Sequence, residues 1–415
     1  MKTIRFYVLG FGLWLMLLLA INPVSAQDWA QSTYNYLQWT AVASSANGKL
    51  VWATLTNGPA FYSTNSGMSW DVRSWNNSYY TTGMASSPNG DVLVAVTGYL
   101  TPGKIYVSTN SGVTWPETTA PLRYWTSVAC SADGRKIVAS EASGSVYIST
   151  DTGQTWTPGG VPVKYWVSVT ISADGTQLAA ASTNGVMCVS TDGGNTWMTN
   201  SSGGSASMLL PAKWPAGQAN NSAPNTNWQA VACSADKSQL VAVVNGGPIF
   251  LSTDAGTNWT ASSAPNAGWK AIACSADGGT IIAAVTNGPI YTSTNAGATW
   301  VSNSIPLSSW VSVAASADGS RLVAAAKPGS GQPKSIIYTL YNVPKPRLHL
   351  VKSGGQAGLA WTLTGTNFVV QQSMGLNGAG WQTLTNEPTL NLSNLQYQLS
   401  LPMTNSSGYF RLATP

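Results

Sequence analysis

The sequence predicts an all-β protein, in which residues 27–343 form a seven-bladed β-propeller and residues 347–415 form a small C-terminal β-sandwich. Three observations lead to this prediction. An aromatic phrase occurs seven times, a second phrase follows each of its first six copies, and every unit contains four short β-prone runs. Repeats of about 40 residues with four strands each are typical of propeller blades, since one blade cannot bury its apolar face alone.

The first phrase opens each predicted blade. Its clearest copies run from Trp125 to Gly134 and from Trp166 to Gly175, and their starts are 41 residues apart. Other copies begin at Trp228, Trp269 and Trp310, and weaker ones at Trp39 and near Tyr80. Most copies end in Asp-Gly or Asn-Gly, a pair that favours a tight hairpin turn. The phrase therefore predicts the first strand of a blade and its turn into the second strand.

The second phrase, which we call the box, has the form Ser-Thr-(Asn or Asp)-x-Gly-x-x-Trp. Its polar third residue and its last tryptophan are Asn65 and Trp70, Asn110 and Trp115, Asp151 and Trp156, Asp192 and Trp197, Asp254 and Trp259, and Asn295 and Trp300. An oxygen of either Asn or Asp can accept hydrogen bonds from turn amides. We therefore expect the boxes to be structural turns between the third and fourth strands, with their tryptophans in the core.

The box resembles the Asp-box, S-x-D-x-G-x-T-W, of the BNR and sialidase-like propellers. The resemblance implies a ligand site around the axis, on the face opposite the boxes. A sialidase would also carry three substrate-binding arginines, an opening Arg-Ile-Pro, a Tyr–Glu pair and an acidic Asp. This chain has no Arg-Ile-Pro, and only Arg73 and Arg123 of its propeller arginines could face such a site. Because these residues are missing, we carry over the fold of the family and not its catalysis. Some similar propellers, of the photosystem-assembly-factor type, bind other proteins during assembly.

Spacing also predicts how the ring closes. A box tryptophan and the next opening aromatic residue are ten apart, as in Trp70 and Tyr80, except that an insert makes Trp197 and Trp228 31 apart. Trp29 stands ten residues before Trp39 with no blade before it, and the seventh unit ends near residues 336–340 without a box. We therefore expect residues 28–34 to supply the outer strand of the last blade and so remove a free sheet edge.

The N-terminus reads as an export signal. Residues 1–26 contain a basic start, an apolar run over 6–21 and a small-residue cleavage site ending at Ala26. The alternative is an uncleaved anchor, although the apolar run is short for a membrane span. We expect a secreted, monomeric mature chain with no membrane span.

The cysteines are predicted to be free despite export. Cys130, Cys233 and Cys274 share one repeat position with Ile171 and Ala315. A position that accepts Cys, Ile and Ala is a small buried apolar slot, and equivalent atoms of stacked sheets, about 10 Å apart, are too distant for a disulfide.

Composition excludes several functions. Lys and Arg total 19 and Asp and Glu total 14, so removing Lys2 and Arg5 with the signal leaves 17 − 14, or +3. So weak a charge argues against nucleic acid as a partner. His349 is the only histidine, which leaves almost no material for a Ser-His-Asp triad or a multi-histidine metal site. We expect no metal and no cofactor.

The acidic residues leave little for catalysis. The eleven aspartates are assigned to hairpins, boxes or the flanks of outer strands: Asp28, Asp71, Asp91, Asp133, Asp151, Asp174, Asp192, Asp236, Asp254, Asp277 and Asp318. The only propeller glutamates, Glu117 and Glu141, lie on neighbouring units. They would form a glycosidase pair if their carboxylates were about 5–9 Å apart, whereas the alternative is two solvated loop acids.

The candidate ligand-binding residues open the blades on the face opposite the boxes. They are Arg123, Tyr124, Trp125, Lys164, Tyr165, Trp166, Trp228, Trp269 and Trp310, together with Trp214 in an insert within residues 198–227. Tryptophan beside Asn, Ser and Gly suits sugar stacking or peptide anchoring, but one tryptophan per blade equally suits packing. The insert is either a ligand-covering loop or a harmless excursion.

These patterns indicate an exported, non-catalytic binding or scaffold protein that recognises a glycan or a partner protein. The alternative is a sialidase-like glycoside hydrolase that uses Glu117 and Glu141. Residues 347–415 carry no repeat, and their short β-runs between Gly and Asn turns indicate an accessory module.

Overall fold

The computed structural model describes residues 29–327, apart from 36, 57, 74, 76–79, 201–220, 304 and 307, then residues 334–341 and seven strands between 348 and 413. All the elements in these ranges are β-strands, and among them no helix is long and apolar enough to cross a bilayer. The predicted signal peptide, Trp214 and most of the insert lie outside the described residues.

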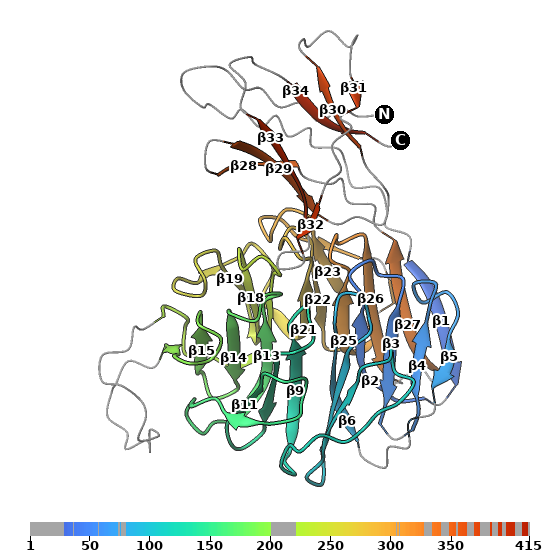
Figure 1. Cartoon of the computed structure of the whole chain (residues 1–415). Coiled ribbons are helices and arrows are strands. Elements are labelled where there is room, and N and C mark those ends of the chain that lie inside the picture. The colour runs from blue at the N-terminus through green and yellow to red at the C-terminus, as the bar shows by residue number, and fades with distance from the viewer. Residues whose placement is uncertain are drawn as a thin grey trace.

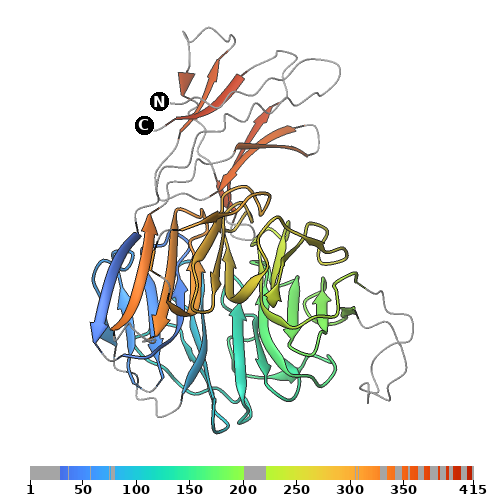
Figure 2. The same ribbon diagram turned by 180° about the vertical axis from the view of Figure 1, so that it is seen from behind.

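Small antiparallel sheets follow one another along the chain and stand around a central axis (Figures 1 and 2). The first two contain β2 (Trp39–Ser44), β3 (Val51–Leu55), β4 (Ala60–Ser63) and β5 (Asp71–Arg73), then β6 (Thr81–Ser86), β7 (Leu93–Thr97) and β8 (Ile105–Ser108). The next two contain β9 (Trp125–Cys130), β10 (Ile137–Glu141), β11 (Val146–Ser149) and β12 (Thr157–Pro158), then β13 (Trp166–Ile171), β14 (Leu178–Ser182), β15 (Met187–Ser190) and β16 (Met198–Thr199).

The following two units merge into one eight-stranded sheet because β18 pairs with β21. It contains β17 (Trp228–Cys233), β18 (Leu240–Gly247), β19 (Ile249–Ser252), β20 (Thr260–Ala261), β21 (Ala267–Cys274), β22 (Ile281–Val285), β23 (Ile290–Ser293) and β24 (Val301–Ser302). The last sheet of the ring contains β25 (Ser309–Ala315), β26 (Arg321–Lys327), β27 (Lys334–Tyr341) and β1 (Trp29–Asn35). Contacts between innermost strands join each sheet to the next, and β25 contacts β2, so the ring is closed.

The second strand of each unit lies at the centre of the packing. All residues of β7, β10 and β14 are buried, and these strands consist mainly of Val, Ile, Leu and Ala. A strand covered on both faces favours a continuous run of small and branched apolar residues rather than alternation. The core therefore lies between neighbouring sheets.

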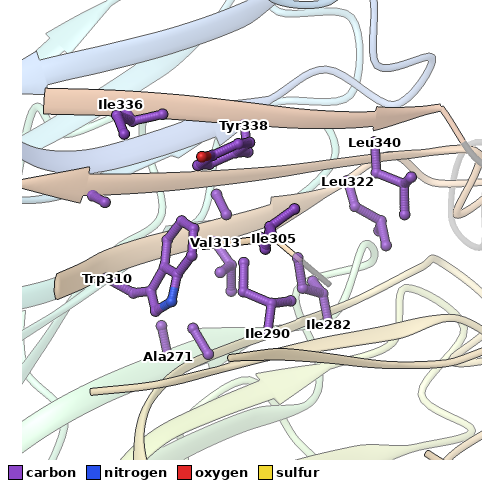
Figure 3. Close-up of a cluster of buried hydrophobic side chains, with 13 residues drawn as sticks. Ala271, Ile282, Ile290, Ile305, Trp310, Val313, Leu322, Ile336, Tyr338 and Leu340 are labelled. Carbon is purple, nitrogen blue, oxygen red and sulfur yellow. The ribbon is translucent and has the colours of Figure 1, made fainter. Parts of the chain in front are cut away.

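The predicted closing strand is present. Strand β1 pairs antiparallel with β27, with Trp29 opposite Leu340, at the outer edge of the last sheet. The Trp29 indole donates a hydrogen bond to Asn303 Oδ1 (3.2 Å). Tyr338 of β27 lies among the buried residues around Trp310 (Figure 3). The pairing expected of residues 28–34 is thus confirmed, and it covers an edge that would otherwise expose unpaired backbone groups.

Each box forms the tight turn that its residues predict. In the third box the Ser149 hydroxyl donates to Asp151 Oδ1 (2.8 Å), and the Thr155 amide donates to the same oxygen (2.9 Å). The Gly153 amide donates to Ser149 Oγ, and Trp156 Nε1 donates to the Gly153 carbonyl (3.1 Å). Asn65, Asn110 and Asn295 accept the corresponding amide bonds in their boxes. The amide oxygen therefore replaces the carboxylate oxygen in this role.

A belt of backbone hydrogen bonds surrounds the axis at the box face. One residue of each unit belongs to it, and all of them except Pro88 donate an amide hydrogen bond to the carbonyl of the next unit at 2.7–3.2 Å. The bonds run from Ala46 to Pro88, and from Ala132 to Ala173, Ala235, Ala276, Ala317 and back to Ala46. Pro88 has no N–H, so it cannot donate to Ala132. The belt therefore has one interruption, between the second and third sheets.

The cysteine slot lies beside this belt. Cys130, Cys188, Cys233 and Cys274 are all free, which confirms that expectation. Cys130, Cys233 and Cys274 line a recess of about 160 Å³ on the axis, so the slot faces this recess and is less buried than the repeat suggested. Loss of hydration still raises the pKa of Cys130 and Cys274 to about 12, which leaves both thiols protonated and unreactive at neutral pH.

The C-terminal segment contains two further antiparallel sheets. One comprises β28 (Leu348–Ser353), β29 (Gln356–Thr362), β33 (Gln396–Pro402) and β32 (Thr389–Asn391), and the other β31 (Gln382–Thr383), β30 (Val369–Ser373) and β34 (Tyr409–Ala413). Leu359, Val370 and Leu399 are buried. The β-strands expected for this segment are present, and their arrangement as a sandwich stays a prediction.

Candidate functional site

The face opposite the boxes, which we call the open face, is built from two kinds of loop. One joins the second and third strands of a sheet, and the other joins the last strand of a sheet to the first strand of the next. Isolated bridges link these loops, namely Gly103 with Arg123, Gly144 with Lys164, and Gly288 with Ser308. Between β18 and β21 the same link extends into a strand pairing. The loops of the open face are therefore held by backbone hydrogen bonds.

The opening tryptophans lie in the core. Those with exposures of 2% or less are Trp39, Trp125, Trp166, Trp228, Trp269 and Trp310. The Trp166, Trp228, Trp269 and Trp310 indoles each donate to a glycine carbonyl of the preceding unit. Burial at this level favours the packing role over the ligand-binding role for Trp125, Trp166 and Trp228. Trp269 and Trp310 are equally buried, but they also border a recess described below.

The two propeller glutamates are held by different cations on different elements. Glu141 ends the second strand β10, where its carboxylate contacts Arg123 Nε (3.1 Å) and accepts the Ser145 amide (3.0 Å). Glu117 lies opposite Tyr106 on the outer side of its sheet and pairs with Lys104. A glycosidase requires two carboxylates that flank one bond of the substrate. The contacts of this pair instead give each carboxylate its own structural partner.

Exposed apolar side chains gather on three neighbouring loops of the open face. We call them the aromatic rim: Tyr99, Leu100, Leu122, Tyr124, Val163 and Tyr165, which are between 44% and 81% exposed. The first two loops are joined directly, because the Gly103 amide donates to the Arg123 carbonyl (2.8 Å). The third is joined to them through residues 142–144, because the Ala142 amide donates to the Tyr124 carbonyl (2.8 Å) and the Lys164 amide donates to the Gly144 carbonyl (3.1 Å). Tyr124 and Tyr165 were expected here, with Arg123 and Lys164 beside them.

Four members of the aromatic rim were not expected from the sequence: Tyr99, Leu100, Leu122 and Val163. A signal for two of them exists. Pro-Leu-Arg-Tyr-Trp ends at Trp125 and Pro-Val-Lys-Tyr-Trp ends at Trp166, so an aliphatic residue precedes the basic residue in both. Leu100 is the most exposed large apolar residue in the described part of the chain.

A second feature of the open face is a recess of about 260 Å³ that contains two lysines, and we call it the basic recess. Lys270 follows Trp269 on the innermost strand β21, and Lys327 ends β26 of the next sheet. The other polar residues that line it are Gln229, Asn245, Thr286 and Ser309. This site was not expected from the sequence, because the two lysines come from different units.

The lining of the basic recess contains no acidic residue. Within the residues that the structure describes, no group of three or more His, Cys, Asp or Glu side chains is arranged to hold a metal ion. The open face therefore offers donors and apolar surface to a ligand.

The fold is shared with solved structures of β-propeller proteins, although no family model and no curated protein matches the sequence. "YCF48 bound to D1 peptide" has a TM-score of 0.56 at 15% identity, over 78% of this chain and 100% of that one. YCF48 from Cyanidioschyzon merolae has a TM-score of 0.53 at 15% identity, over 76% of this chain and 98% of that one.

A third similar structure is an enzyme. The GH74 xyloglucanase from Xanthomonas campestris has a TM-score of 0.54 at 14% identity, over 81% of this chain and 59% of that one. One neighbour thus binds a peptide and another hydrolyses a polysaccharide, and one fold can support both activities. The comparisons show that this chain has a β-propeller fold.

Proposed function

We propose that this protein is an exported, non-catalytic propeller that binds a partner protein through the aromatic rim of its open face. The observation that carries the proposal is the distribution of exposed apolar residues. Of the ten large apolar residues exposed in the described part of the chain, six belong to the aromatic rim. A concentration of exposed apolar side chains on one part of a surface marks an interaction site more often than scattered ones do.

The proposal includes seven blades of the Asp-box type and export through residues 1–26. In its support, the backbone belt passes through seven units before it returns to Ala46. In all six boxes the serine hydroxyl donates to the Asn or Asp side chain, and the last sheet takes its outer strand from the N-terminus. The free, unreactive thiols are compatible with an oxidising compartment.

The chemistry of the aromatic rim favours a protein over a glycan. Sugar sites combine flat aromatic faces with polar groups, whereas Leu100, Leu122 and Val163 offer aliphatic surface that a sugar hydroxyl cannot satisfy. Tyr124 and Tyr165 can bury their rings while their hydroxyls stay hydrated, as tyrosines at protein interfaces do. The nearby Arg123 guanidinium is partly exposed and adds a polar border.

The experiment compares two matched variants. In the first, Leu100, Tyr124 and Tyr165 are changed to Ser. In the second, Met68 and Val113, which are equally exposed apolar residues on the box face, are changed to Ser. The purified proteins are used to probe an array of peptides from exported proteins and a glycan array. We expect peptide binding that the aromatic rim variant loses and the box-face variant keeps.

Other outcomes would contradict the proposal. Binding to glycans but to no peptide would assign the open face to a sugar. Equal peptide binding by both variants would place the interaction elsewhere.

The second candidate is a glycoside hydrolase that uses Glu117 and Glu141, and the xyloglucanase neighbour is the observation that favours it. Because each carboxylate is occupied by its own cation, we expect no turnover of a fluorogenic glycoside panel. Release of sugar by the wild-type chain, lost in E117Q and E141Q, would reverse this conclusion.

A further inference from the structure

The basic recess holds two positive charges without an opposing negative charge. Within the described residues, Lys270 and Lys327 take part in no ion pair, although Lys104, Arg123 and Lys237 each contact a carboxylate. Both recess lysines line the same 260 Å³ space, and that lining contains no acid. Two ammonium groups that line one recess repel each other, and an anion bound between them would relieve this repulsion.

The described acidic residues lie away from the basic recess, either paired with other cations or on the box face. Glu117 and Glu141 face Lys104 and Arg123. The other described acids are the box and hairpin aspartates together with Asp71, which begins β5 beside its box, and all of these belong to the face opposite the recess. Of the 14 acids in the chain, only Asp28 and Glu387 lie outside the described residues. The counter-charge is therefore expected from another molecule.

The position of Lys270 is unusual among the repeats. It directly follows an opening tryptophan, where the other units have Thr40, Thr82, Thr126, Val167, Gln229 and Val311. It is the only charged residue in this set. Lys270 and Lys327 are both exposed, so the surrounding units remove only part of the hydration of Lys270. This partial loss of hydration lowers the pKa of Lys270, and the positive charge of Lys327 lowers it further.

The walls of the basic recess suit a carboxylate on an aliphatic stem. Neutral donors are available from Gln229, Asn245, Thr286 and Ser309, and Val311, Trp269 and Trp310 add apolar surface. The pairing of Asn245 with Gly268 joins two units at this wall, so the donors are held by backbone hydrogen bonds before a ligand binds. Inorganic phosphate would use the charges but would leave the apolar wall uncovered.

We propose that the basic recess binds the carboxylate of an acidic side chain in a peptide segment of the partner protein. This inference rests on the proposed function, because the aromatic rim and the basic recess lie on the same open face over different sheets of the ring. The partner is then a segment that combines apolar residues with Asp or Glu.

The test measures the reactivity of individual lysines in the full-length protein by limited acetylation and mass spectrometry. The probes are N-acetylglutamate amide, its neutral counterpart N-acetylglutamine amide, and inorganic phosphate. We expect the glutamate probe to slow acetylation of Lys270 and Lys327 by about threefold or more, in a saturable manner. We expect no change with the glutamine probe, and no change at Lys49, an exposed lysine on the box face.

Variants complete the test. K327M should abolish the protection of Lys270, whereas K49M should retain it. K327M should also raise the Tm in the absence of any probe, because it removes the repulsion between Lys270 and Lys327. The Tm measurement does not depend on the reactivity of either lysine. Equal protection by the glutamine probe, protection by phosphate alone, or unchanged protection in K327M would overturn the proposal.

These results are separable from the function test. Protection of Lys270 needs no partner protein, so its absence would leave the role of the aromatic rim intact. Protection of Lys270 with no peptide binding to the aromatic rim would refute the proposed function alone.

Discussion

Replacing Trp310 and Trp125 by Phe distinguishes the hydrogen bond of an opening tryptophan from its packing. Both indoles are buried to 2% exposure or less. Trp310 Nε1 donates to the Gly288 carbonyl at 2.8 Å, whereas Trp125 Nε1 has no hydrogen-bond partner among the described residues. Both side chains lose the same volume, so the cavity contributions nearly cancel in the comparison. Only W310F leaves a buried carbonyl without its donor.

The expected magnitude follows from that difference. Leaving a buried acceptor unsatisfied costs about 1–3 kcal/mol, whereas removing an unpartnered N–H costs nothing in hydrogen bonding. W310F should therefore lower the free energy of unfolding by about 1–3 kcal/mol more than W125F does. The assay is urea unfolding followed by far-UV circular dichroism, with the slope of the transition checked for each variant. Equal losses, or a larger loss for W125F, would refute the assignment of these hydrogen bonds.

Three further predictions concern turns and charge. D254N should keep nearly all of the stability, because asparagine fills this position in three other boxes, whereas D254A should cost about 1–2 kcal/mol in urea unfolding. Burial alone would raise the pKa of Asp174, but hydrogen bonds from Lys237 and neighbouring turn residues lower it overall. The ionised Asp174 therefore stabilises the folded protein above the unfolded pKa of about 3.9. This stabilisation is lost as the pH falls through the lower folded pKa. K237M should move that acid loss of Tm to higher pH, and an unchanged acid limb would contradict the pairing. G134A should destabilise because φ is 67°, whereas A296G at φ 58° should be neutral or stabilising by up to about 1 kcal/mol, as paired thermal melts would show.

The architecture was predictable where it depends on spacing within one unit. The Asp133–Gly134 turn and the Asp151 box each place their donors and acceptors within a few residues, so local sequence determines their geometry. The outer strand at Trp29 was predictable for a related reason, since it matched the spacing of the other outer-strand tryptophans. The C-terminal segment lacks such a repeat, and only the presence of strands could be predicted.

The candidate site was less predictable because it depends on contacts between units. Aromatic residues at the opening positions suit both stacking and packing, and only the burial of residues such as Trp166 separates the two roles. Lys270 and Lys327 are 57 residues apart and lie in units that look ordinary alone. The exposed Leu100 sits in a loop without a counterpart in the other repeats. Charge and exposure on the open face are thus properties of the assembled ring.

Pro88 makes the junction between the second and third sheets the weakest part of the backbone belt. In the belt, every other junction has an amide-to-carbonyl hydrogen bond, whereas the second and third sheets lack one there. These two sheets are joined away from the belt, by the backbone pair of Gly103 and Arg123 on the open face and by the Thr82 hydroxyl, which donates to the Trp125 carbonyl (2.7 Å). Strand β1, which pairs with β27, stabilises a different junction, the one between the last sheet and the first. Under thermal or mechanical strain, we therefore expect the second and third sheets to separate first, beside Ala132 at the box face. The junction between the last sheet and the first should separate later.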